Sequence, residues 1–183
     1  MKDLKEVVTI EQKRYSDFFS DGVEKLRQGK ETYASELLLE INDETIGEPF
    51  NLVRVDFIYK SQNGEDSINE LRLESNSSYK PVEIRTDNAL IHIKPFCWNS
   101  CEIACNEFEL ELLKDWVRQW LKTEEEFNGI SSAIHSCSLP EEKDGQFSFI
   151  VDFGTSPVEA FYDLINNLER AGATQITIET EEV

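Results

Sequence analysis

A chain of 183 residues with 39% hydrophobic residues, eleven Phe and three Trp has enough apolar material to fold around a core, which excludes general disorder. Its formal net charge of −19 disfavours nucleic acid and anionic membranes as partners and favours basic proteins. Residues 1–30 hold seven basic and six acidic side chains, so the rest of the chain carries −20. A high net charge also favours solubility alone, and that simpler explanation stays open.

The start of the chain gives an expectation about its compartment. The segment from Met1 to Glu6 lacks the apolar stretch of a signal peptide, and no apolar run approaches the roughly 20 residues that cross a bilayer. We therefore expect a cytosolic (cytoplasmic) protein with no membrane partner, in which the sequon at Asn76 has no glycosylation role.

The first half of the chain predicts one helix followed by antiparallel strands. Thr9 and Gln12 have the spacing of a capping box, and aromatic residues then recur at helical spacing, so we expect a helix over about 10–28. Apolar and polar residues alternate cleanly in 52–60, and the Asn63-Gly64 turn follows this strand. The four expected strands are 35–41, 52–60, 68–75 and 82–85.

The second half predicts a more regular order of elements. Asn106 with Glu109 forms a capping box before an apolar helical stripe, and Ser156 before Pro157 begins a second helix that ends at Gly172. The other expected elements are a strand over 89–96, the first helix to about residue 123, a strand over 130–138, a turn over 140–145, a strand over 146–153 and a strand over 173–180.

This order of strand, helix, strand, strand, helix and strand is that of a ferredoxin-like domain. The expected fold class is α+β, with an antiparallel sheet, helices packed on it, and a C-terminal half of ferredoxin-like βαββαβ order. No linker separates the halves. We therefore expect a single composite domain over 1–183, with a helix plus an antiparallel meander in 1–86 and the ferredoxin-like half in 87–183.

Four cysteines are candidates for metal or redox chemistry. Cys97, Cys101 and Cys105 recur every four residues, and Cys137 stands apart. Structural zinc sites use close pairs and iron–sulfur sites use other spacings, and on an extended strand the three thiols would be too spread for one ion. We expect buried free thiols, with no metal and no cofactor, and a metal site at the first three cysteines is the alternative.

Two further patterns are like catalytic motifs. His135 and Cys137 are two apart in an expected strand and point to the same face, but a nucleophilic pair also needs a hydrogen bond between them and an orienting third group. The tripeptide Asp152-Phe153-Gly154 is like the metal-binding tripeptide of kinases, yet no glycine-rich loop precedes it. The other histidine, His92, lies in a different strand. We expect no catalytic residue.

Acidic clusters are the remaining candidates for a site. One lies at the end of the second-half helix and one in the following turn. Negative charge at a helix carboxyl end is slightly destabilising because the helix dipole is negative there, which favours a role other than stability. The residues that we expect to contact a basic partner are Glu107, Glu111, Asp115, Glu124, Glu125, Glu126, Glu141, Glu142 and Asp144.

In length, acidity, absence of a signal peptide and absence of a catalytic motif, the chain resembles bacterial immunity proteins, which neutralise a cognate toxin that is often a basic nuclease. The resemblance is one of general character and involves no family motif, so it carries no residue roles. It implies a basic protein partner such as a toxin domain, and an inhibitory function without catalysis.

Two other classes of function stay open. A regulatory or small-ligand-binding module would use a pocket lined by aromatic residues, since ferredoxin-like domains host many unrelated functions. An enzyme would bring residues with perturbed pKa values together in a cleft, with His135 or the cysteines close by.

Overall fold

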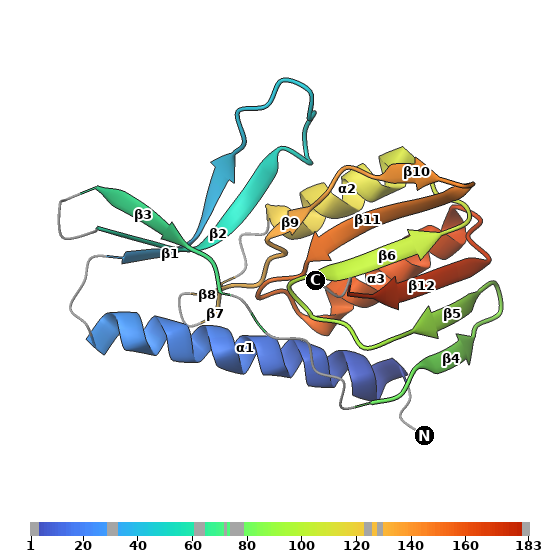
Figure 1. Ribbon diagram of the computed structural model, residues 1–183, viewed down its shortest axis with the longest axis horizontal. Helices are drawn as coiled ribbons and strands as arrows, with labels where there is room; N and C mark the ends of the chain where they lie inside the picture. Colours follow the sequence, from blue (N-terminus) through green and yellow to red (C-terminus); the bar gives the residue numbers. More distant parts are fainter. Residues whose placement is uncertain are drawn as a thin grey trace.

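The computed structural model describes residues 4–28, 33–60, 65–71, 73, 79–122, 126–127 and 130–180. Within these ranges the chain forms a large sheet of seven strands, a separate sheet of three strands, and a short pair of strands (Figure 1). The helices are α1 (Leu4–Gln28), α2 (Leu110–Leu121) and α3 (Val158–Arg170). No helix of this part of the chain is both long and apolar enough to cross a membrane.

The large sheet contains the predicted ferredoxin-like unit, which confirms the α+β fold class. Strands β10 (Glu141–Lys143), β11 (Gln146–Asp152), β6 (Cys101–Cys105) and β12 (Gln175–Glu179) lie in that order, and each neighbouring pair is antiparallel. Helix α2 connects β6 to the β10 side of the sheet, and α3 connects β11 to β12. This is the split βαβ arrangement of two interleaved units.

Three short strands complete the large sheet. Strand β5 (Leu90–Ile93) pairs in parallel with β12, and β4 (Val82–Arg85) pairs antiparallel with β5 at the edge. Strand β9 (Ser136–Cys137) pairs with β11 beside β10. The sheet is therefore mixed, with one parallel pairing in an otherwise antiparallel arrangement.

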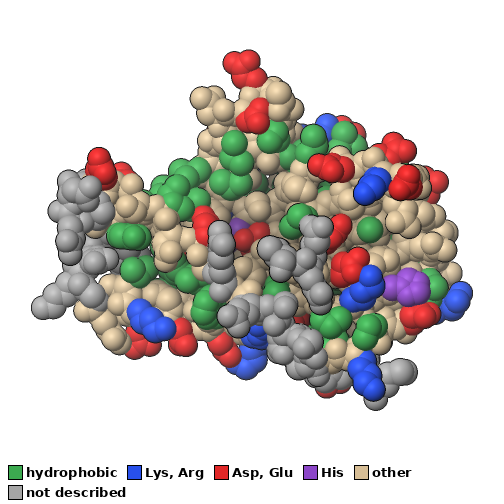
Figure 2. All heavy atoms as spheres, viewed as in Figure 1, with side chains coloured by type: hydrophobic (Ala, Val, Ile, Leu, Met, Phe, Trp, Pro, Cys, Tyr) green, Lys and Arg blue, Asp and Glu red, His purple; other side chains and the backbone are tan. Residues whose placement is uncertain are grey.

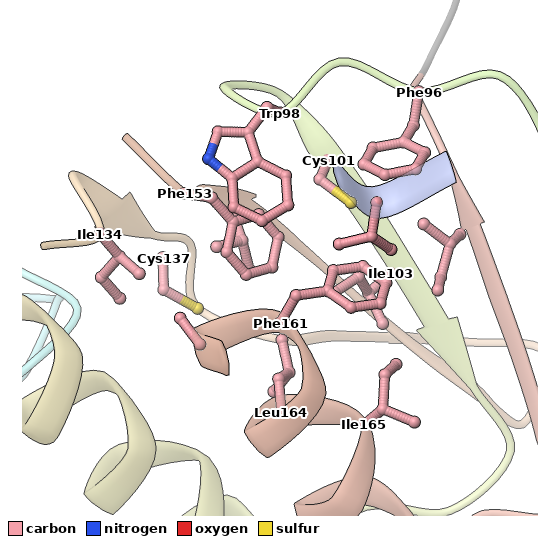
Figure 3. Packing of buried hydrophobic residues seen from close by; sticks show 14 of the residues in the cluster. Phe96, Trp98, Cys101, Ile103, Ile134, Cys137, Phe153, Phe161, Leu164 and Ile165 are labelled. Atoms are coloured by element: carbon pink, nitrogen blue, oxygen red, sulfur yellow. The ribbon is translucent and has the colours of Figure 1, made fainter. Parts of the chain in front are cut away.

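The core lies between one face of this sheet and the helices α2 and α3, which both cover the same face (Figure 1). Alternate residues of the central strands point into it, so Cys101, Ile103 and Cys105 are buried while Glu102 and Ala104 lie on the open face. Figure 3 shows the centre of this layer, where the ring of Phe153 stacks on Trp98 at 4.6 Å between ring centroids. Burial of such aromatic side chains contributes a large share of the apolar stabilisation.

The three-stranded sheet is bent in its middle. Strands β1 (Tyr33–Glu40) and β2 (Leu52–Lys60) form a hairpin, and β3 (Asp66–Asn69) pairs with the end of β2. Their pairing is regular on both sides of Glu36 and Asp56 but omits those two residues, and Glu36 has a φ of +54°. In Figure 1 the hairpin turns away from β3 at this level, and its loop projects at the top of the molecule.

Helix α1 spans the molecule from the side of β4 to the side of β3 (Figure 1). Its buried stripe includes Val8, Tyr15 and Phe19, and the ring of Phe19 stacks on Phe57 of β2 at 5.1 Å. These residues belong to the same contiguous cluster of buried side chains as the ferredoxin-like core. The short pair β7 (Glu126–Phe127) and β8 (Ile130–Ser131) lies beside the bend of β1.

Helix boundaries differ from the sequence predictions where capping residues have other uses. Helix α1 already includes Leu4, so the capping box at Thr9 is wrong, because the apolar stripe extends to the buried Val7 and Val8. Asn106 does not cap α2: its Oδ1 accepts hydrogen bonds from the backbone N–H groups of Thr174 and Gln175. The N-cap of α3 is Pro157, one residue after the predicted Ser156, which is buried.

Strand assignments differ in the same way. The sequence predicts 89–96 as the first strand of the ferredoxin-like unit, but that strand is β6, and β5 is an addition at the edge. The predicted turn over 140–145 contains β10, with a tight turn at Asp144-Gly145, both at positive φ. Left-handed residues of this kind match the twist of a two-residue hairpin loop. The predicted strand over 130–138 is two short strands with irregular chain between them, and the predicted strand over 68–75 is β3, which ends at Asn69.

Candidate functional site

The most unusual group of side chains surrounds His135, which is 1% exposed. Its backbone is fixed on both sides, since its N–H donates to the carbonyl of Asp152 at 2.8 Å and its carbonyl accepts from the N–H of Arg54 at 2.7 Å. The segment between β8 and β9 is thereby attached to β11 and to β2 at once. These two backbone bonds place the imidazole between the two sheets.

Two carboxylates hold the ring of His135. Its Nδ1 lies 3.0 Å from Oδ1 of Asp56, and its Nε2 lies 3.3 Å from Oε1 of Glu36. The first contact is an ion pair with poor hydrogen-bond alignment. Burial opposes the charged imidazolium, but the pairing of the ring with the Asp56 and Glu36 carboxylates outweighs it and raises the pKa of His135 to about 10. The ring is therefore a buried cation between two anions at neutral pH.

Other donors complete the hydrogen bonding of the two carboxylates. Asp56 accepts from the hydroxyl of Tyr15 at 2.8 Å and from the backbone N–H of Leu71 at 2.5 Å. Burial alone would raise the pKa of Asp56, but hydrogen bonds from His135, Leu71 and Tyr15 lower it below the ordinary value. Glu36 accepts from the N–H of Ser131 at 2.6 Å, and the hydroxyl of Thr155 also contacts it.

Two more carboxyl groups lie in the field of this cluster. Burial, together with the charge of Asp56, raises the pKa of Asp152 to about 7, although His135 lowers it. Burial and the charge of Asp56 also raise the pKa of Glu70, which is exposed at the surface end of the cluster. The pKa of Tyr15 is well above its ordinary value because of burial and the neighbouring carboxylates, so this hydroxyl stays neutral and acts as a donor.

The walls of the cluster leave little free space around the imidazole. The rings of Tyr15 and Phe19 meet His135 edge-on at centroid distances of 6.2 and 6.1 Å. Gly154, at φ +48°, brings its backbone so close that a Cβ added there would lie 2.1 Å from Cδ2 of His135. Its carbonyl accepts from the indole N–H of Trp98 at 3.0 Å, which fixes this close approach.

The arrangement has the residues of an acid–base site but not its access. A general base has to come within hydrogen-bond distance of a substrate, and both nitrogens of His135 already face protein carboxylates. The thiol of Cys137, two residues after His135, points to the carbonyl of Ser138 at 3.5 Å, and burial raises its pKa well above the ordinary value. We interpret the cluster as a structural junction, which we call the His135 junction.

The four cysteines are buried free thiols, as predicted. Cys101 and Cys105 lie in β6 and face the core, and burial raises the pKa of the Cys105 thiol to about 11. High thiol pKa values make these groups poor nucleophiles and poor metal ligands at neutral pH. Within the described ranges, no group of three or more His, Cys, Asp or Glu side chains has a geometry suited to a metal ion.

The predicted partner-binding acids are exposed where the structure describes them. Glu141, Glu142 and Asp144 lie on β10 and its turn, at one edge of the large sheet. The other exposed members are Glu107, before α2, and Glu111 and Asp115, on α2.

The acids on α2 are partly neutralised within the helix. Lys114 lies 2.7 Å from Glu111, and Arg118 lies 2.9 Å from Asp115. In Figure 2 acidic side chains gather over the region of β10 and α2. Glu124, Glu125 and the side chain of Glu126 lie outside the described residues.

A hollow of about 560 Å³ lies between α2 and α3. Its lining is polar rather than aromatic and consists of Asn88, Gln119, Asp163, Asn166, Asn167, Glu169 and Arg170. This hollow therefore lacks the aromatic lining that we expect for a ligand-binding module.

Sequence reasoning missed the junction because its members are far apart in the chain. Tyr15, Glu36 and Asp56 read as ordinary members of a helix and two strands. The tripeptide at 152–154 is like a kinase motif in sequence. In the structure it packs against the ring of His135. The signal present in the sequence is a carboxylate in the middle of each of two strongly apolar strands.

Neither a protein-family model, nor a curated protein, nor a solved structure matches this chain.

Replacing His135 by Gln should destabilise the protein by about 3–5 kcal/mol, because two buried carboxylates lose their cation. His92→Gln is the matched control, since His92 is partly exposed and its Nδ1 lies 3.9 Å from the exposed Glu83. Urea unfolding at pH 7 measures both free energies of unfolding. Equal, small losses for the two variants would contradict the structural role of the His135 junction.

Replacing Gly154 by Ala should cost about 3 kcal/mol or more, because both the positive φ and the contact with His135 oppose a Cβ. Gly145→Ala separates the two causes: Gly145 has a φ of +75° but no atom within 4 Å of an added Cβ, so only conformational strain of about 1 kcal/mol is expected. Thermal unfolding of both variants provides the comparison.

The pH dependence of stability should carry contributions of the same sign from His135 and Asp152, in different pH ranges. The pKa of His135 rises from 6.5 to about 10 on folding, so its contribution is complete below about 6.5 and is lost as pH rises through about 10. The pKa of Asp152 rises from 3.8 to about 7, so its contribution is complete in acid and is lost as pH rises through about 7.

We therefore expect Asp152→Asn to gain stability relative to the wild type between pH 5 and pH 8. Urea unfolding at these two pH values, with NMR titration of the His135 ring, measures the change. A constant difference between the two proteins across this range would contradict the raised pKa of Asp152.

Proposed function

We propose that the protein is an acidic inhibitor that binds a basic protein partner, in the manner of an immunity protein that neutralises a basic cognate toxin such as a nuclease. One observation carries this proposal. The ionisable groups around His135 that have strongly shifted pKa values are paired with one another in the interior, whereas exposed carboxylates cover the exterior. Chemistry at the interior groups lacks access, and the exterior groups are suited to recognition.

The acidic exterior favours rapid encounter with a basic surface. A net charge of −19 on a folded body of this size creates a long-range attractive field for a cationic partner. Steered association of this kind reaches about 10⁸ M⁻¹s⁻¹ or more at low salt. Carboxylates held on a sheet edge also lose less conformational entropy on binding than those of a disordered tail, which favours affinity.

The β10 edge is the part of the predicted acidic set that retains the most uncompensated charge. Glu141, Glu142 and Asp144 are exposed, and Lys143 is the basic residue among them. None of these three acids forms an ion pair within the described part of the chain. On α2, by contrast, lysine and arginine of the same helix already neutralise Glu111 and Asp115.

A small-ligand-binding module is the second candidate, and the polar hollow between α2 and α3 is the observation that favours it. Its amide side chains could bind a hydroxyl-rich or amide-rich ligand. A ligand of that class would raise the melting temperature without dependence on salt, and binding to a basic protein would depend strongly on salt.

The proposal predicts a salt-sensitive association rate that depends on the β10 edge. The partner is first captured on the immobilised protein, identified and purified. Stopped-flow mixing then measures its association rate constant between about 20 and 300 mM salt, a range over which the screening of charges becomes strong. We expect the association rate constant to fall about tenfold or more across this range. We also expect Glu141→Gln/Glu142→Gln to lower it several-fold at low salt.

The matched control is Glu83→Gln/Asp87→Asn, which removes the same charge at the opposite edge of the sheet, on and after β4. A smaller effect of the control variant supports a contact at β10. An association rate that does not change with salt would contradict the proposed recognition by charge.

A further inference from the structure

The hairpin of β1 and β2 has a row of apolar side chains beyond the bend that is exposed at Leu37 and Ile41 and covered at Val55, which is 5% exposed. We call residues 37–55 the hairpin limb. Leu37 and Leu39 of β1 point to the same side, opposite Val55 and Val53 of β2, and Ile41 continues the row. Leu37 is 46% exposed and Ile41 is 41% exposed. Figure 2 shows hydrophobic side chains on the visible side of the hairpin.

The opposite face of the hairpin limb is fastened to the body of the protein. Arg54 donates through Nε to the carbonyl of Leu121 at 2.8 Å and through Nη1 to the carbonyl of Glu36 at 3.0 Å. Nζ of Lys122, just after α2, lies 2.5 Å from a carboxylate oxygen of Glu48. The hairpin limb is therefore held in place by one face, and the opposite face carries its exposed apolar side chains.

Strand β1 is also an edge strand. In the three-stranded sheet the order is β1, β2, β3, so β2 is the strand neighbour of β1 within the described ranges. An edge strand directs alternate backbone N–H and C=O groups outward, where an added strand can pair with them. The hairpin limb thus offers both a backbone edge and a row of aliphatic side chains.

The charge of the hairpin limb is mostly negative. Residues 37–55 include four Glu or Asp residues and one basic residue, Arg54, whose guanidinium is bonded to backbone carbonyls. Glu36 is turned inward to His135 and Glu48 meets Lys122, but Glu40, Asp43 and Glu44 are exposed. These three acids lie at the tip, where Figure 2 shows acidic side chains at the top of the molecule.

We propose that the hairpin limb binds an extended segment of a basic protein, which adds a strand to the edge of β1. Aliphatic side chains at alternate positions of the segment contact Leu37, Leu39 and Ile41, and its lysine or arginine side chains face the acids of the tip. Strand addition gains affinity from backbone hydrogen bonds and specificity from alternate side chains. This inference rests on the proposed function and assigns a surface and a sequence class to the partner.

The same charge argument disfavours a second copy of this chain as the occupant. Two edges pairing with one another would bring the acids of both tips together, and like charges in an interface oppose association. A basic segment neutralises the tip instead.

The test uses a fluorescently labelled seven-residue peptide of alternating lysine and valine, with binding followed by anisotropy. A peptide with glutamate in place of lysine tests the charge, and a peptide of the same composition with its valines in one block tests the alternation. We expect binding of the alternating lysine peptide, about tenfold weaker binding of the block peptide, and no binding of the glutamate peptide.

Two variants of the full-length protein test the surface. Leu37→Ser/Ile41→Ser removes the apolar row, and Glu40→Gln/Asp43→Asn/Glu44→Gln removes the charge of the tip. Each should weaken peptide binding about tenfold or more. Leu139→Ser/Ile150→Ser is the matched control, because these residues are 46% and 45% exposed outside the hairpin limb. Circular dichroism confirms that each variant is folded.

Equal peptide affinity of the wild type and both limb variants would overturn the inference, as would concentration-dependent dimerisation that the Leu37→Ser/Ile41→Ser variant abolishes. The purified natural partner separates this result from the proposed function. If that partner still binds limb variants with strong salt dependence, the inference fails and the proposed function stands. If limb variants lose the peptide but no basic protein partner binds the wild type, the assigned surface stands and the proposed function fails.

Discussion

The charge of His135 between Glu36 and Asp56 is the interaction on which the connection of the two sheets depends. A buried ion pair of this kind adds little net stability compared with apolar packing, but removal of one partner is costly. Its value is therefore geometric: the carboxylates come from the middle of the bent hairpin, and the imidazole comes from a segment tied to β11. Only one arrangement of hairpin and large sheet satisfies all three groups.

The bend and the junction require one another. Glu36 adopts a left-handed backbone conformation that costs free energy for a residue with a Cβ, and it does so inside a strand. The cost is offset because the turn directs the carboxylate to His135 and to the N–H of Ser131. The same turn directs the rest of the hairpin outward, so the interior charges determine where the exposed apolar row and its acidic tip are presented.

The sequence predicts those parts of the fold that depend on local periodicity. Strands β2 and β4 have the predicted bounds, and the apolar stripes of α2 and α3 place both helices, because alternation and helical spacing are local properties. Strand β6 has no clear alternation of apolar and polar residues in its sequence, because two of its five residues are cysteines. The site was not predictable, since Tyr15, Glu36, Asp56 and His135 meet only in three dimensions and a positive φ at Glu36 has no signature in a glutamate.

The separation of the junction residues along the chain has a consequence for biosynthesis. Glu36 precedes His135 by 99 residues, so during translation the hairpin emerges long before its counter-ion exists. Until then both carboxylates remain hydrated, and the interaction with His135 that offsets the cost of the bend is absent. Closing so long a loop is slow compared with forming local helices and hairpins. The His135 junction therefore forms only after the segment that carries His135 has been synthesised.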